Sequence, residues 1–227
     1  MKLPLSLFNA DPRPTNHIAE VIETSTSEFL AQCLEPDDLS YAKMPPFGSW
    51  VTAKDEETGN QIYAVVYHST TAPIDSVHRA RALGLSLHEL RDQQPQIFAM
   101  LRTEFRALIV GFYAPPQTEL AGVSVEQSSV QSMAFQYLPP RPPQVHQAVY
   151  TCDSQHIVQF TEELDFLRSL FNIPGAPVDS LIAAVIRTTY QHRKGDRPWL
   201  IRAGRMLSLL LKDDYDRLRI ILNQIHL

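Results

Sequence analysis

Three short runs rich in β-branched and aromatic residues limit the possible fold of this chain more than any other feature. They span residues 45–53, 61–68 and 106–113. Gly, Pro and charged residues separate the runs, which is typical of strands joined by tight connections. The connection at residues 55–60 contains Gly59 and Asn60, either of which can adopt the positive φ that a hairpin turn requires. We therefore predict an antiparallel sheet in this part of the chain.

The same pattern extends to both sides of these runs. We predict two earlier strands, over residues 18–26 and 28–34. The third run belongs to a longer strand over residues 103–114, and one more short strand follows over residues 132–138. The polar stretch 117–132 could hold a further strand around residues 122–125.

A different pattern interrupts the sheet between residues 75 and 101. Ser86 and Glu89 have the spacing of a capping box, in which each side chain bonds the backbone of the other residue. We predict a short helix over 86–92 that ends before Pro95, and then a second helical turn that reaches residue 101. This helical excursion lies between two strands of the sheet.

A proline-rich segment divides the chain. Four of the five residues 139–143 are proline, which favours extended backbone and excludes a helix or a central strand. Beyond it, apolar residues recur every three to four positions, which predicts amphipathic helices over residues 154–171, 178–192, 199–212 and 213–225. We expect Asp213 to cap the last helix, with Asp214 and Asp216 in its first turn.

These patterns predict a protein of the α+β class. An N-terminal antiparallel β-barrel with a helical excursion would occupy residues 1–144, and a C-terminal helical bundle would occupy residues 145–227. Four short helices are not stable singly, so they must pack on each other or on the barrel.

Charge and cysteine content narrow the function. Residues 1–150 have a net charge of -6 and residues 151–227 a net charge of +1, which argues against a nucleic-acid coat protein but allows a local basic patch. The two cysteines, Cys33 and Cys152, suggest neither a disulfide framework nor a metal site. Without a signal-peptide pattern or an apolar run of about 20 residues, we expect a cytoplasmic protein with no membrane span.

The first 150 residues resemble a known family. The resemblance rests on the first strand at 20–26, the Phe47-Gly48-Ser49-Trp50-Val51 turn into a strand, the strand at 63–67 and the proline-rich exit at 138–145. This order is similar to the HAS barrel, the small β-barrel at the N-terminus of HerA-type translocases and of the rotary ATP synthase α and β chains. The resemblance implies a barrel that is not catalytic, assembles subunits into rings and contacts partners.

This chain departs from that family after the barrel. The family continues with a P-loop ATPase domain, whereas this sequence contains no Gly-x-x-x-x-Gly-Lys-Ser/Thr motif. Lacking both the backbone cradle for phosphate and its lysine, the chain cannot hydrolyse ATP by that mechanism. No nucleophile, base and orienting residue occur in a recognised spacing either, so we expect no enzyme activity, cofactor or metal.

One concentration of charge stands out in the helical part. Residues 187–205 carry six basic side chains against Asp196 alone, with Tyr190, His192 and Trp199 between them. The basic side chains are Arg187, Arg193, Lys194, Arg197, Arg202 and Arg205. Such a group can bind an acidic protein surface, or phosphates and stacked bases. The alternative is structural, with Trp199 in the core and some arginines paired with acidic residues at 162–165.

We therefore expect a non-catalytic assembly or adaptor protein that uses the barrel and the helices to bind a protein partner. The alternative is a nucleic-acid-binding accessory factor that acts through the basic side chains of residues 187–205. The ring-forming habit of the similar family also makes a homo-oligomer an arrangement to test.

Overall fold

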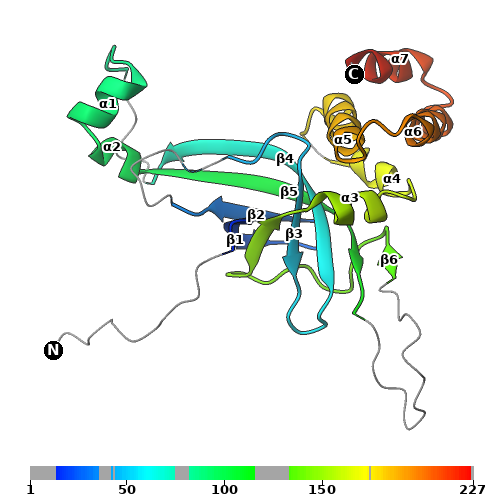
Figure 1. Cartoon of the computed structure of the whole chain (residues 1–227), viewed down its shortest axis with the longest axis horizontal. Helices are drawn as coiled ribbons and strands as arrows, with labels where there is room; N and C mark the ends of the chain where they lie inside the picture. The colour runs from blue at the N-terminus through cyan, green and yellow to red at the C-terminus, as the bar shows by residue number, and fades with distance from the viewer. Residues whose placement is uncertain are drawn as a thin grey trace, which may run out of the picture.

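A computed structural model describes residues 14–35, 42, 44–74, 82–115, 133–173 and 175–225 of the chain. It contains a β-barrel and, on one side of it, a group of helices (Figure 1). The helical excursion projects from the barrel away from these helices (Figure 1). The predicted fold class is confirmed.

The barrel closes without a gap in its hydrogen bonding. Its strands are β1 (His17–Thr24), β2 (Glu28–Cys33), β3 (Trp50–Lys54), β4 (Gln61–Pro73), β5 (Leu101–Tyr113) and β7 (Ala148–Thr151). The order is β2-β1-β7-β3-β4-β5, and β5 then pairs with β2 to complete the circle, with every pair antiparallel. The short β6 (Ala134–Phe135) pairs with the end of β5. The predicted segment 117–132 lies outside the described residues.

Small side chains fill the barrel. Its interior cluster contains five alanines, and the larger members come from β1 to β5 and β7. Phe29 and Phe105 are the largest fully buried side chains of this cluster. A barrel of six strands is narrower than the eight-stranded barrels whose interior is just filled by ordinary side chains. Alanine at alternate strand positions is therefore what the closed geometry requires.

The strands β4 and β5 extend beyond the barrel as a two-stranded ribbon. Their pairing continues to Pro73 and Leu101, past the residues where β5 pairs with β2. The ribbon leads to α1 (Leu87–Gln93) and α2 (Gln96–Ala99), which form the predicted excursion. Ser86 and Glu89 make both hydrogen bonds of the capping box, so this sequence prediction is confirmed.

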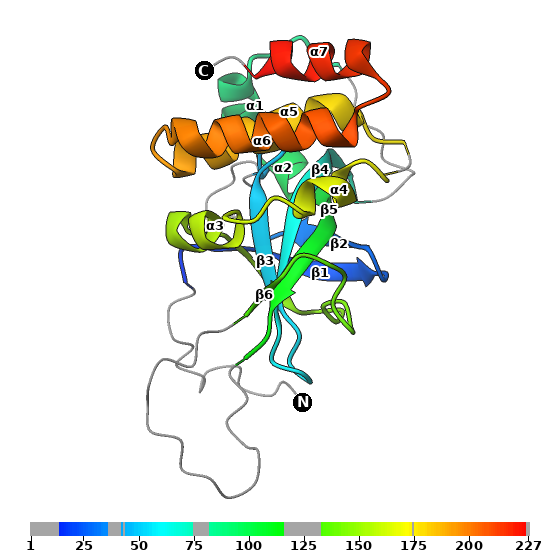
Figure 2. The ribbon, with the colours of Figure 1, turned by 90° about the vertical axis from the view of Figure 1, so that its right-hand side faces the viewer.

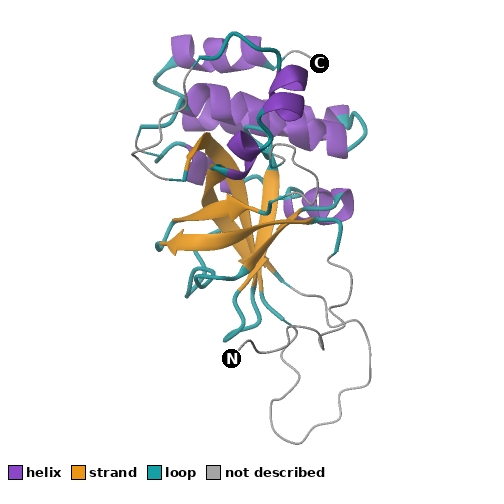
Figure 3. Ribbon diagram, turned by 90° about the vertical axis from the view of Figure 1, so that its left-hand side faces the viewer, coloured by secondary structure: helices purple, strands orange, loops and turns teal. Residues whose placement is uncertain are grey.

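Helices cover one outer side of the barrel. They are α3 (Ser154–Phe160), α4 (Phe166–Leu170), α5 (Val178–His192), α6 (Arg197–Leu210) and α7 (Tyr215–Gln224). Figure 2 shows α5 and α6 above the strands and α7 farther out, and Figure 3 shows the same separation into a helical and a strand layer. Six consecutive residues of α5, from Leu181 to Ile186, are buried, because α5 lies between the barrel and the other helices.

The barrel and the helices share one hydrophobic core. Trp50 of β3 contacts Phe160 of α3 and Phe166 of α4, with ring centroids 5.8 Å and 5.3 Å away. The Trp50 indole also donates a buried hydrogen bond of 3.0 Å to Thr189 of α5. Tyr63 of β4 stacks on Phe160 at 4.8 Å. Strands β3, β4 and β5 are therefore buried on both faces, and the two parts form one unit.

Three details differ from the sequence prediction. The helix expected over 154–171 is two helices, because Gln136 bonds the Phe160 carbonyl and the Phe166 N–H between them. The residue that caps α7 is Asp214 and not Asp213, since Asp214 accepts from the Arg217 N–H. Strand β7 lies past residue 144 and completes the barrel. Its pattern is weak because only Val149 of its four residues is buried.

None of the described helices has the length and apolar character that a membrane span needs. Both cysteines are free, as the sequence suggested.

Gly48 marks a close approach of the barrel to α5, and this generates the first prediction. It has φ +78°, and a Cβ there would lie 2.7 Å from the Ala184 Cβ. We expect Gly48→Ala to lower the free energy of unfolding by about 2–4 kcal/mol, because it adds both backbone strain and a clash between packed elements. Urea titration followed by circular dichroism measures this loss.

The matched control is Gly84→Ala. Gly84 has φ +71°, but no atom lies within 4 Å of the Cβ position. This variant adds similar strain without a clash, so it should cost no more than about 1 kcal/mol. Equal losses in the two variants would contradict the close packing of α5 on the barrel.

Candidate functional site

The predicted basic cluster does not form one exposed patch. Arg193 is the main departure, because its side chain is only 5% exposed. Its guanidinium donates to the carbonyl of Val158 at 2.8 Å and to the hydroxyl of Thr161 at 3.2 Å. It also pairs with Glu162 at 2.6 Å and with Asp196 at 3.3 Å. Arg193 therefore joins α5 to the end of α3 as part of the core.

Two more arginines of the cluster have partners within the protein. Arg202 pairs with Glu162 at 2.7 Å, so Glu162 binds two arginines. The hydrogen bonds from Arg202 and Arg193 hold the pKa of the Glu162 carboxyl below its usual value. Arg187 donates to the backbone carbonyl of Gln224 at the end of α7. The predicted pairing with acidic residues at 162–165 is thus found for Arg193 and Arg202, whereas Arg187 binds a backbone carbonyl instead.

The aromatic residues of the cluster are not stacking platforms. Trp199 is fully buried, and its indole donates to the Thr161 carbonyl at 2.7 Å. The Arg193 guanidinium lies over the Trp199 ring at 5.3 Å. His192 contacts the Ser154 hydroxyl at 2.9 Å, and burial lowers its pKa. His192 is therefore neutral at pH 7 and adds no charge to the surface.

Three basic side chains of the cluster are both exposed and unpaired. Lys194, Arg197 and Arg205 have no ion pair or side-chain hydrogen bond with any described residue. Lys194 lies in the turn between α5 and α6 at φ +54°. Arg197 and Arg205 belong to α6, whose buried residues Trp199, Ala203 and Leu207 are on the opposite face.

The exposed face of α6 alternates apolar and basic residues. Ile201 is 56% exposed and Leu209 is 71% exposed. Both lie four residues from Arg205, and Ile201 also lies four residues from Arg197, so the four side chains share one helix face. We call Arg197, Ile201, Arg205 and Leu209 the α6 stripe. Sequence analysis identified its arginines from their charge but did not identify the two apolar members.

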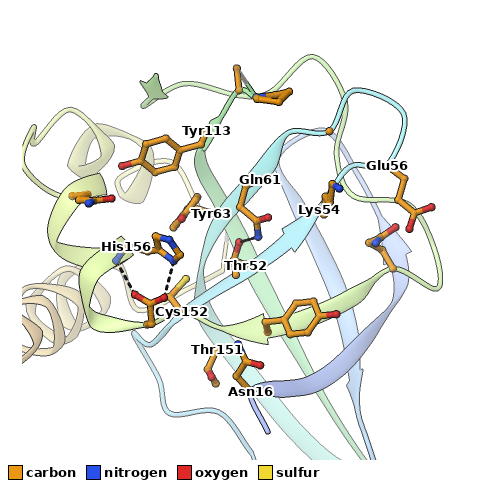
Figure 4. A pocket seen from close by; sticks show the side chains of 17 residues that line it. Asn16, Thr52, Lys54, Glu56, Gln61, Tyr63, Tyr113, Thr151, Cys152 and His156 are labelled. Atoms are coloured by element: carbon orange, nitrogen blue, oxygen red, sulfur yellow. Dashed lines mark hydrogen bonds and ion pairs between the residues drawn. The ribbon is translucent and has the colours of Figure 1, made fainter. Parts of the chain in front are cut away.

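A cavity of about 580 Å³ opens on the outside of the barrel, beside α3. Figure 4 shows its lining, which comes from β3, β4, β5, β7 and α3. The side chains used below are Thr52, Lys54, Glu56, Gln61, Tyr63, Tyr113, Cys152, Asp153 and His156. None of them was a predicted site residue. The segment Cys152-Asp153-x-x-His156 is the one local signal that could have suggested the cavity.

The cavity holds an ordered acid–histidine pair at the start of α3. Asp153 caps the helix by accepting the His156 N–H at 2.9 Å, and its other oxygen lies 2.8 Å from Nδ1 of His156. Because an ionised carboxylate can only accept, Nδ1 carries the proton that it donates. Burial and then the charge of Asp153 raise the pKa of the neighbouring Cys152 thiol. Cys152 is therefore a thiol at neutral pH, which disfavours a role as nucleophile.

Comparison with known families places one domain in this chain. The family model of the HAS barrel domain matches residues 18–114, the part that contains β1 to β5. No curated protein matches the chain significantly. The resemblance seen in the sequence is thereby confirmed for the barrel, and β7 adds the strand that closes it beyond the matched residues.

The buried position of Arg193 generates the second prediction. Arg193→Met keeps most of the apolar stem against Trp199 but removes every hydrogen bond of the guanidinium. We expect the free energy of unfolding to fall by about 2 kcal/mol or more, because the Val158 carbonyl and the Thr161 hydroxyl lose their charged donor. Arg205→Met is the control and should change it by at most about 0.5 kcal/mol. If the two variants lost similar amounts of unfolding free energy, a structural role for Arg193 would be contradicted.

The third prediction concerns Glu162 and pH. Since the folded state lowers the pKa of Glu162, its contribution to stability is present above its unfolded value of about 4.5 and is lost as pH falls through the lower folded value. The difference in unfolding free energy between wild type and Glu162→Gln should therefore shrink between pH 7 and pH 3. Urea titration at both pH values measures it. Glu163→Gln, which removes a neighbouring carboxylate without these two arginines, should show a much smaller dependence.

Proposed function

Since residues 18–114 of this chain are a HAS barrel domain, we propose that the protein is a non-catalytic assembly or adaptor protein that binds a protein partner. The observation that carries the proposal is the α6 stripe. Its partner presents acidic and apolar side chains on one surface, because these complement the two arginines and the two apolar residues of the stripe.

The composition of the stripe favours a protein over a nucleic acid. Ile201 and Leu209 are exposed between the basic residues, and apolar side chains of this kind gain free energy when another apolar surface covers them. A phosphate backbone offers them no such surface. The arginines supply orientation and faster association through charge, while the apolar residues supply most of the binding free energy.

The pattern of paired charges supports the same choice. Binding to a phosphate backbone depends on the number of cations that are free to replace counterions. Arg187, Arg193 and Arg202 already bind groups within the protein. The aromatic Trp199 is buried and cannot stack on a base.

The non-catalytic part of the proposal rests on the chemistry of the cavity. Its thiol has a raised pKa, and its only histidine is hydrogen-bonded to the helix-capping carboxylate. The family resemblance also implies an assembly role for the barrel, which supports the proposal.

A second candidate is a nucleic-acid-binding accessory factor. It is favoured by the exposure of Lys194, Arg197 and Arg205 near the start of α6. It predicts that the chain binds labelled duplex or single-stranded DNA or RNA at low salt, that binding weakens steeply as salt rises, and that Arg197→Glu with Arg205→Glu abolishes it.

The fourth prediction tests the adaptor proposal. The full chain is used as bait in a nuclease-treated lysate of the source organism, and the captured protein is then purified to measure its Kd. Ile201→Asp should raise the Kd at least about tenfold, because it places a carboxylate where the partner presents apolar and acidic groups. Leu209→Asp should act in the same direction.

The matched control is Leu87→Asp on α1. Leu87 is 53% exposed, which is close to the exposure of Ile201, and α1 projects away from α6 (Figure 1). This variant should bind the partner as wild type does. The proposal would be contradicted if Ile201→Asp bound the captured protein as tightly as wild type does. It would also be contradicted if nuclease treatment abolished the capture.

A further inference from the structure

The cavity beside α3 is lined by a tyrosine whose hydroxyl has no hydrogen-bond partner among the described residues. Tyr63 is 2% exposed and lines the cavity. One face of its ring stacks on Phe160 at 4.8 Å, and the edge of Tyr113 packs against it at 5.3 Å. Its hydroxyl makes no hydrogen bond with any described residue. Because this hydroxyl is not one of the described polar atoms that are both buried and unpaired, its oxygen is accessible from the cavity and can bind a group that enters.

The charges around this hydroxyl determine which group fits. Asp153 provides a carboxylate, and it is the capping residue that α3 already holds in place. Burial, followed by the neighbouring Cys152, Tyr113 and Asp153, raises the pKa of Tyr63. Tyr63 is therefore a neutral phenol whose oxygen can accept a hydrogen bond.

The remaining charged side chains lie at the other end. Figure 4 shows Lys54 and Glu56 across the cavity from Tyr63 and His156. Neither Lys54 nor Glu56 has an ion pair with a cavity residue. Between the two ends, Gln61 donates to the Thr52 hydroxyl, which leaves the amide oxygen of Gln61 as an acceptor.

Tyr113 provides an aromatic ring in the lining of the same cavity. Figure 4 shows this ring above Tyr63, with its broad side toward the viewer. A cation is attracted to the face of an aromatic ring, and this attraction grows where water is excluded. A guanidinium can also donate hydrogen bonds in several directions at once, to a hydroxyl and to a carboxylate oxygen.

We propose that this cavity binds an organic cation, a guanidinium or primary ammonium group that lies against Tyr113, donates to the Tyr63 hydroxyl and is balanced by Asp153. The cavity volume of about 580 Å³ exceeds what the cation alone fills, and it lies within the range of sites for small molecules. The rest of the ligand extends toward Lys54, whose ammonium binds a carboxylate or carbonyl oxygen of the same ligand. An arginine, free or within a partner protein, has this combination of groups.

The fifth prediction tests the cation site with small probes and the full chain. N-acetyl-L-arginine amide is titrated and followed by the NMR shifts of the cavity backbone amides. N-acetyl-L-citrulline amide, which has nearly the same shape without the charge, should bind at least about tenfold more weakly. Equal binding of the two probes, or an absence of cavity shifts with the arginine probe, would overturn the proposal.

Three variants test the assigned roles. Asp153→Asn should weaken binding of the arginine probe about tenfold, while asparagine keeps the helix cap. Tyr63→Phe should weaken it several-fold and leave the free energy of unfolding nearly unchanged, because the hydroxyl has no partner to lose. Lys54→Gln should weaken the binding of free L-arginine several-fold, because the ligand carboxylate loses the ammonium group that binds it.

Matched controls separate these effects from changes in folding. Asp214→Asn makes the same replacement at the cap of α7, outside the cavity, and Tyr137→Phe removes a hydroxyl outside the cavity lining. Both should bind the arginine probe as wild type does. Wild-type affinity in Asp153→Asn would overturn the role of the carboxylate and with it the proposal.

Free L-arginine distinguishes the two sources of the cation. Tighter binding of free arginine than of the capped probe indicates a small-molecule ligand whose carboxylate binds Lys54. Tighter binding of the capped probe indicates an arginine within a peptide chain. The site is independent of the α6 stripe, so Ile201→Asp should leave the binding of both probes unchanged.

Discussion

The contact of Trp50 with three helices is the interaction on which the rest of the structure depends. Its ring meets Phe160 of α3 and Phe166 of α4, and its indole bonds Thr189 of α5. Trp50 belongs to β3, and the next residue of this strand, Val51, is part of the hydrophobic cluster inside the barrel. A movement of the helices would therefore disturb the strand that forms the inner core. Barrel and helices are coupled through the strands that both cores share.

Because of this coupling, the described helices after the barrel contribute to the stability of the barrel itself. The interior of a six-stranded barrel is narrow, and five of its fifteen buried members are alanines, so it buries a limited apolar area. Burial of apolar area is the main source of folding free energy. Tyr63, Val65 and Val110 direct further apolar surface outward, where the helices cover it. The helices in turn gain a flat apolar surface to pack on, which short amphipathic helices need. Each part supplies the burial that the other lacks.

Local patterns in the sequence predicted the elements, and long-range contacts decided the site. The capping box at Ser86 and the bounds of α5 follow from residues within one or two turns, so both predictions are confirmed. The burial of Arg193 depends on Glu162, which is 31 positions away and reaches it only in the folded chain. Counting charges along the sequence cannot separate this arginine from the exposed Arg205.

The cavity was unpredictable for the same reason. Tyr63 and Tyr113 are 50 residues apart, and they meet because β4 and β5 pair in a specific register across a bulge. The acidic end is supplied by Asp153, which follows the last barrel strand. Only closure of the barrel through β7 brings it beside the tyrosines.

Closure of the barrel also determines how this protein can recognise anything else. Within the barrel the described strands pair on both sides, and β6 pairs with the end of β5 beyond β2. Unpaired edges are found on the β4–β5 ribbon, past the residues that pair with β3 and β2. On the barrel itself, recognition must therefore use side chains. Helices cover one outer side of the barrel, and the cavity opens beside α3. The outer face of α6 and this cavity are consequently two places where the fold presents unpaired side chains that a partner or ligand can complement.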